Sequence, residues 1–241
     1  SDAIEATGLL VRLRQFGVDG ADEGVRRMLG LVFSRDVSIR DAAVEAVDVL
    51  FLSGADSPVA AAAALAEVAS AAALGELAAL EEVLKLLVAD GRVPPEGAVI
   101  RATWALATAR EASDAARAAA FTVLSMAAAT SPEVIAPHVD HAAAALERAC
   151  RSGDGALARA AAALLSRGRP GGNAGTKDSA GIATPALAPD GPVFAALAKV
   201  LSPGSSLTGR AWYPAAEQSI ATLYALHPDP EGAASDVIRS F

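Results

Sequence analysis

The sequence has little cysteine and few aromatic side chains. Of its 241 residues, one is cysteine, Cys150, and 4% are aromatic. A single cysteine cannot form a disulfide within the chain and has no cysteine partner for a zinc site, which excludes a disulfide-stapled secreted scaffold and favours a reducing compartment. Strands favour aromatic and β-branched residues, so the aromatic shortage in a chain that is 53% hydrophobic favours closely packed helices over an all-β fold.

Long apolar runs are absent as well. The longest stretch without a charged residue covers 118–132 and contains several hydroxyl side chains, whereas a bilayer span needs about 20 apolar residues. The chain begins Ser1-Asp2-Ala3, without Met and without the basic and apolar segments of a signal peptide. We therefore expect no membrane segment, no secretory leader and a piece of a longer protein.

Apolar residues recur at helical spacing along most of the chain, and no segment shows the strict alternation of a strand. Within 39–50 they occupy positions i, i+4, i+7, i+8 and i+11, which predicts an amphipathic helix. Ser38 precedes this run and Asp41 comes three residues after Ser38, a pattern similar to a capping box. We therefore expect a helix that begins with Ser38 as its N-cap.

Proline and glycine suggest where other helices begin and end. Proline at the first helical position loses no hydrogen bond, so the Ser-Pro pairs at 57–58 and 131–132 predict helix starts. Ser113 predicts another start, with the helix running to Ala129. Gly75 and Gly91 predict breaks on either side of a leucine-rich helix.

Successive helices joined by short turns form antiparallel pairs. Two such helices in each repeat of about 40 residues are the unit of HEAT and armadillo arrays. We therefore predict an all-α fold, a HEAT-repeat-like α-solenoid of stacked antiparallel helix pairs. The expected organisation is a helical array over 1–167, a flexible Gly/Pro-rich loop over 168–192 and further HEAT-like helices over 193–241.

Three patterns that suggest catalysis or ligand binding fail on spacing. The glycine-rich run 171–177 lacks the Gly-Lys-Ser/Thr order of a phosphate-binding loop. His138, Asp140 and His141 lack a further nearby metal ligand. Cys150 lies between arginines, but no histidine has the sequence context of its general base. We expect no enzyme activity, no cofactor, no metal and no small-molecule substrate.

Charge is distributed unevenly. The net charge is −8, yet 148–177 holds six basic residues and one acidic residue. Guanidinium groups on helix ends and in a loop can contact backbone phosphates without reading bases. An ordinary solvated helix face is the alternative. The predicted nucleic-acid contacts are Arg148, Arg151, Arg159, Arg167, Arg169 and Lys177.

Several motifs resemble subunit 1 of condensin, its HEAT-repeat regulatory subunit. In the run 2–52, Glu5 and its neighbours are similar to the family's "EAI" helix, 16–18 to its "FGV" turn, 25–29 to its "VRRML" helix and 33–40 to its Arg-ending junction, in the same order, with Phe33 where the family often has tryptophan. The stretch 77–106 is similar to its leucine-and-glutamate helix and the tryptophan-bearing helix after it. The stretch 211–238, "AWYPAAEQSIATLYALHPDPEGAASDVI", is similar to a further segment. The motif residues there, which we interpret as structural, are Trp212, Tyr213, Glu217, Gln218 and Tyr224.

The resemblance implies a non-enzymatic fragment from the C-terminal half of such a subunit. It implies binding to the kleisin subunit, to the heads of the SMC ATPases and to double-stranded DNA or chromatin, in the nucleus and on mitotic chromosomes with a cytoplasmic pool. ATP hydrolysis would belong to the SMC partners. The alternative is an unrelated HEAT or armadillo adaptor for transport or trafficking that binds peptides in its groove. A basic surface facing DNA favours the first, and an acidic or aromatic groove favours the second.

Overall fold

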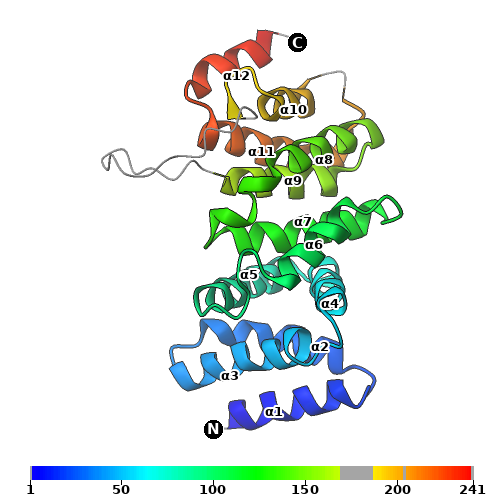
Figure 1. Cartoon of the computed structure of the whole chain (residues 1–241), viewed down its shortest axis with the longest axis vertical. Coiled ribbons are helices and arrows are strands. Elements are labelled where there is room, and N and C mark those ends of the chain that lie inside the picture. The colour runs from blue at the N-terminus through cyan, green and yellow to red at the C-terminus, as the bar shows by residue number, and fades with distance from the viewer. Residues whose placement is uncertain (1, 169–186, 203–204, 240–241) are drawn as a thin grey trace.

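The structure is a computed structural model that describes residues 2–168, 187–202 and 205–239. These residues form twelve α-helices with short 3-10 and π turns and contain no strand, and the helices stack along the long axis of the molecule (Figure 1). None of the described helices is long and apolar enough to cross a membrane. The α-helices are α1 (Asp2–Gln15), α2 (Ala21–Leu29), α3 (Val37–Val47), α4 (Pro58–Ala71), α5 (Leu74–Ala89), α6 (Ala98–Thr108), α7 (Asp114–Ala128), α8 (Val139–Ser152), α9 (Gly155–Arg167), α10 (Pro192–Leu201), α11 (Gly209–Leu226) and α12 (Pro230–Arg239).

The helices pack as two layers of neighbouring pairs. In one layer α5 packs on α7, α7 on α9 and α9 on α11. In the other, α4 packs on α6 and α8 packs on α10, and contacts of α6 with α7, α8 with α9 and α10 with α11 join the two layers. This arrangement confirms the predicted all-α, HEAT-like array of helix pairs.

Small side chains set how closely the helices approach. Ala158, Ala161 and Ala162 on α9 are fully buried. A Cβ atom on Gly155 would lie 2.2 Å from the carbonyl oxygen of Ala211, so the start of α9 touches the backbone of α11. A hydrogen bond of 2.9 Å, donated by Thr222 Oγ1 to the Ala162 carbonyl, joins the same two helices. The high alanine content therefore determines the stacking of the layer.

Several helix boundaries follow from local capping. The Ser57 hydroxyl accepts a hydrogen bond from the Ala60 amide and the Ser113 hydroxyl accepts one from Ala116, both at 3.1 Å, which confirms two predicted N-caps. Gly91 has a φ of +73° after the last turn of α5, which confirms the predicted end of that helix.

Three boundary predictions are wrong. Helix α3 is capped by Asp36, whose carboxylate accepts from the amide of Ser38 at 2.8 Å, so Ser38 lies inside the helix. Gly75 lies in the first turn of α5, because the Glu76 carboxylate accepts from the Ala73 amide at 2.7 Å and starts the helix before the glycine. The residues after Ser131 form two 3-10 turns and not an α-helix.

The predicted flexible loop, 168–192, is described only at its ends. Residues 169–186 lie outside the described residues. Gly168 follows α9, and 187–191 form a turn before α10, which already begins at Pro192.

Candidate functional site

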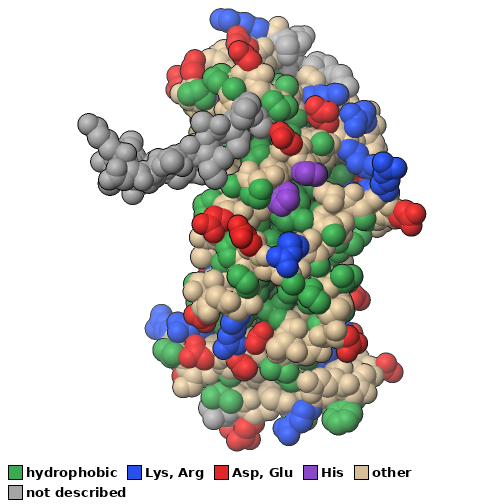
Figure 2. Space-filling view, viewed as in Figure 1, with side chains coloured by type: hydrophobic (Ala, Val, Ile, Leu, Met, Phe, Trp, Pro, Cys, Tyr) green, Lys and Arg blue, Asp and Glu red, His purple; other side chains and the backbone are tan. Residues whose placement is uncertain are grey.

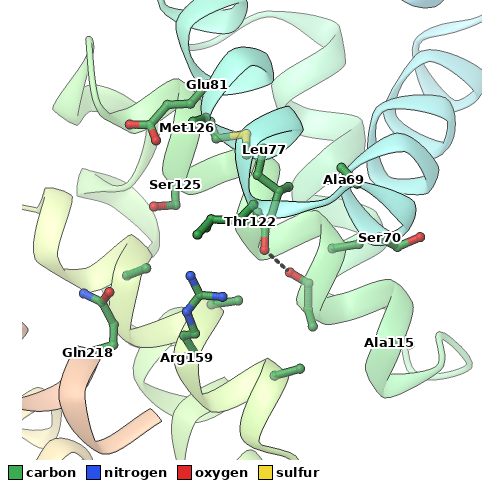
Figure 3. Close-up of a pocket in the computed structure, with 18 of the residues that line it drawn as sticks. Ala69, Ser70, Leu77, Glu81, Ala115, Thr122, Ser125, Met126, Arg159 and Gln218 are labelled. Carbon is green, nitrogen blue, oxygen red and sulfur yellow. Dashed lines mark hydrogen bonds between the residues drawn. The ribbon is translucent and has the colours of Figure 1, made fainter. Parts of the chain in front are cut away.

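A groove of about 560 Å³ lies beside two of the predicted basic residues, Arg159 and Arg167. Helices α4, α5, α7 and α9 line it, and α11 contributes Gln218 (Figure 3). It is therefore built from helices that are distant in the sequence.

The floor of the groove comes from helical periodicity. On both α7 and α9, the lining positions recur at i, i+3, i+4 and i+7, which places them on one face of each helix. Most of these positions are alanine, so the floor is shallow and apolar. The residues at these positions are Ala115, Ala118, Ala119 and Thr122 on α7, and Ala156, Arg159, Ala160 and Ala163 on α9.

Two cations lie among these small residues. Arg159 is exposed and points into the groove (Figure 3), and it forms no ion pair with any described residue. Arg167 also lines the groove; its Nη2 lies 3.0 Å from Glu81 Oε1, while its Nε is buried and has no hydrogen-bond partner in the described structure. Lys85 Nζ lies 3.4 Å from Glu81 and 3.6 Å from Glu82, so two carboxylates pair with Lys85 and Arg167, and Arg159 leaves the groove locally positive.

Two further predicted residues lie on α8 and do not line the groove. Arg148 Nη2 lies 3.2 Å from Asp114 Oδ1, and Arg151 Nη1 lies 3.6 Å from Glu147 Oε2. The side chains of Arg148 and Arg151 are 50% and 63% exposed. Such exposed pairs contribute little, typically below about 1 kcal/mol, so both guanidinium groups can exchange their partners for a phosphate.

Arg148 and Arg151 form a basic surface that we call the α8 edge. Lys199 lies on α10, which packs on α8, and it extends this surface. Burial raises the pKa of the Cys150 thiol, and a hydrogen bond with Ser205 and the charges of Lys199 and Arg151 oppose this shift. The Ser206 amide, a few residues after α10, donates to the Cys150 carbonyl at 3.0 Å, which places the end of α10 beside the end of α8. Figure 2 shows Lys and Arg side chains gathered at the right edge of the upper half, over the end of α8. The raised pKa and the burial of Cys150 indicate a packing role for the thiol.

Four of the six predicted basic residues lie in two places of the described structure. Arg148 and Arg151 form the edge of α8, and Arg159 and Arg167 line the groove. Arg169 and Lys177 lie outside the described residues. The sequence prediction missed Lys199 and Gln218, which are brought to these places by packing between helices distant in the chain. A stripe of alanines at i, i+4 and i+7 on α9 was the available signal for the groove.

The histidines of the rejected metal motif pack against Trp104. The His138 ring lies 4.4 Å from the Trp104 ring and 5.6 Å from that of His141, centroid to centroid. Partial burial, and then the neighbouring His141, lower the pKa of His138. Trp104 is buried and donates a hydrogen bond of 3.1 Å to the Val134 carbonyl. Across the described ranges, no three His, Cys, Asp or Glu side chains are grouped to hold a metal ion.

Over nearly its whole length, the chain is similar to subunits of condensin from a plant and a frog. No family model matches the chain. The chain is 27% identical over 245 residues to the condensin-1 complex subunit CAP-D2 of Arabidopsis thaliana, covering 99% of this chain and 16% of that protein. It is 29% identical over 242 residues to condensin complex subunit 1 of Xenopus laevis, covering 97% of this chain and 17% of that protein. The chain spans about a sixth of the length of these curated relatives.

Proposed function

Because the chain is homologous over nearly its whole length to condensin complex subunit 1, we propose that it is a non-catalytic HEAT-repeat scaffold of condensin that acts in mitotic chromosome condensation. The observation that carries the proposal is this similarity, which covers 97–99% of the chain. The fold supports it, since a stack of helix pairs offers long surfaces for partners.

The distribution of perturbed groups also supports a scaffold. The pKa values of Cys150, His138 and Arg92 are shifted, but these residues do not converge on one cleft. Arg92 pairs with Glu45 at 2.7 Å at the surface, whereas Cys150 and His138 lie in packing contacts. Catalytic sites usually gather such groups around a single cavity.

The proposed partners are the kleisin subunit, the heads of the SMC ATPases and double-stranded DNA or chromatin. The proposed location is the nucleus and mitotic chromosomes, with a cytoplasmic pool. For DNA we favour the α8 edge, where Arg148, Arg151 and Lys199 lie on exposed helix ends. Contacts of this kind fix a protein on the phosphate backbone without selecting a sequence.

Copurification tests the scaffold proposal most simply. The folded chain, checked by circular dichroism, is mixed with the kleisin subunit of the same organism and isolated through a tag on either partner. We expect a stoichiometric complex. A folded chain that does not bind kleisin would instead favour an adaptor for transport or trafficking.

Charge reversal tests the DNA contacts. In the assembled complex, the double variant Arg148→Glu/Arg151→Glu should weaken duplex binding and reduce the slope of log K against log salt by about 2, because each lost phosphate contact contributes about 0.9. The control is Arg27→Glu/Arg35→Glu, which changes the charge equally on exposed residues at the other end of the array. If both pairs change affinity equally, the α8 edge is not the DNA site.

A further inference from the structure

We propose that the groove between α5, α7 and α9 binds an amphipathic helical peptide segment that pairs a carboxylate with Arg159. This inference rests on the proposed function in treating the chain as a protein-binding scaffold. It separates Arg159 and Arg167 from the basic residues of α8, because only the first two lie against an apolar floor.

The floor requires a ligand with an apolar face. Leu74 is 75% exposed at one end of the groove, and Leu77 and Met126 line it together with the alanines of α7 and α9. A nucleic-acid backbone presents phosphates and sugars and would leave this surface uncovered. A peptide with small and aliphatic side chains covers it and removes apolar area from water.

The walls favour a helix over an extended peptide. An extended peptide needs main-chain hydrogen-bond partners, as at the open edge of a sheet. The walls here are helices whose interior main-chain groups already bond within the helix, and even the Thr122 hydroxyl donates to the Ala118 carbonyl at 2.8 Å. A helix satisfies its own main chain, and rows of alanine let it approach closely by packing of ridges into grooves.

The charges favour an acidic flank on that helix. Arg159 points into the groove with no ion pair to any described residue (Figure 3). The Nε of Arg167 is buried without a hydrogen-bond partner in the described structure, and the two nearby carboxylates, Glu81 and Glu82, already pair with Arg167 and Lys85. A carboxylate of the ligand would form an ion pair with Arg159, whereas a basic ligand would be repelled by Arg159 and Arg167.

Two designed peptides test the proposal directly. Both are helical and carry the same Ala/Leu face, but one has Glu and the other Lys at the positions beside that face. Each is labelled with a fluorophore, and its binding to the 241-residue chain is measured by fluorescence anisotropy. We expect the Glu peptide to bind about tenfold more tightly than the Lys peptide, because Glu forms an ion pair with Arg159 whereas Lys is repelled by Arg159 and Arg167.

Three variants localise the binding. Arg159→Glu should reverse the preference between the peptides, and Ala163→Trp, which fills the groove, should weaken both. Arg27→Glu makes the same charge change at an exposed position of α2, outside the groove, and should leave both affinities unchanged. Arg159→Gln, which removes the charge without adding a like charge to the site, provides a second test if Arg159→Glu disturbs the fold.

Equal affinities, no saturable binding of either peptide, or an Arg27→Glu effect as large as that of Arg159→Glu would overturn the proposal. This measurement contains no kleisin, so its result tests the groove site independently of the condensin role. Peptide binding without kleisin binding would keep the groove site and refute the condensin role, whereas kleisin binding without peptide selectivity would refute the groove site alone.

Discussion

Replacement of Arg117 by methionine should destabilise the array strongly. Arg117 is 4% exposed and its guanidinium lies at the turn between α6 and α7. Its Nη1 donates to Asp114 Oδ1 at 2.9 Å, and its Nη2 donates to the carbonyls of Ala109 and Arg110. Methionine fills a similar volume but removes all three hydrogen bonds.

The expected loss is about 3 kcal/mol. Hydrogen bonds from a charged donor contribute about 1.5–3 kcal/mol each, but Ala109 and Arg110 are partly or fully exposed and their carbonyls can bind water once the guanidinium is gone, so the full sum does not apply. For a chain of this length, that loss lowers the Tm by about 6–12 °C. Thermal unfolding followed by circular dichroism at 222 nm provides the assay.

Arg148 provides a matched control, because it pairs with the same Asp114 Oδ1 from an exposed position. Arg148→Met should cost less than about 1 kcal/mol, since exposed ion pairs contribute little. The reasoning fails if Arg148→Met lowers the Tm as much as Arg117→Met, because burial would then not determine the strength of these contacts.

Two further predictions concern packing and pH. Gly155→Ala places a Cβ 2.2 Å from the Ala211 carbonyl oxygen and should lower the free energy of unfolding, measured by chemical denaturation, by about 1–3 kcal/mol. In the control Gly75→Ala the new Cβ meets no atom within 4 Å, so this variant should be neutral or stabilising. Equal effects of the two variants would contradict the close contact of α9 with α11. Partial burial, and then His141, lower the pKa of His138 below 6.5, so the unfolded chain binds this proton more tightly and the stability contributed by neutral His138 is lost as the pH falls below about 6.5. Melts of His138→Gln should show a smaller loss between about pH 7.5 and 5.5, and an unchanged loss would exclude His138 as a source.

Local sequence patterns predicted most of the helices because the side chains that begin and end a helix act on residues close to them in the sequence. Ser57 and Ser113 cap their helices through side chains that bond amides three residues away. The same kind of pattern predicted Ser38 as the N-cap of α3, and this prediction is wrong. Asp36, two residues earlier, is the N-cap, because its carboxylate accepts a hydrogen bond from the Ser38 amide. Sequence patterns also predicted a break at Gly75, although glycine is tolerated in a first turn once Glu76 caps the amide of Ala73.

The candidate site was less accessible to sequence reasoning. The charge pattern identified Arg148, Arg151, Arg159 and Arg167, but it treated them as one surface. Which of them faces the groove depends on how α9 packs between α7 and α11, a contact between segments distant in the sequence. Lys199 reaches the α8 edge for the same reason, and no pattern around residue 151 indicates it.

The most direct test of the condensin role is the composition of the complex that the protein forms in dividing cells. The tagged protein is isolated from mitotic extract, and its partners are quantified by mass spectrometry against a tag-only control. The account predicts a kleisin and two SMC ATPase subunits in amounts equal to the tagged protein. Transport or trafficking components in that ratio, with no kleisin or SMC subunit, would contradict it.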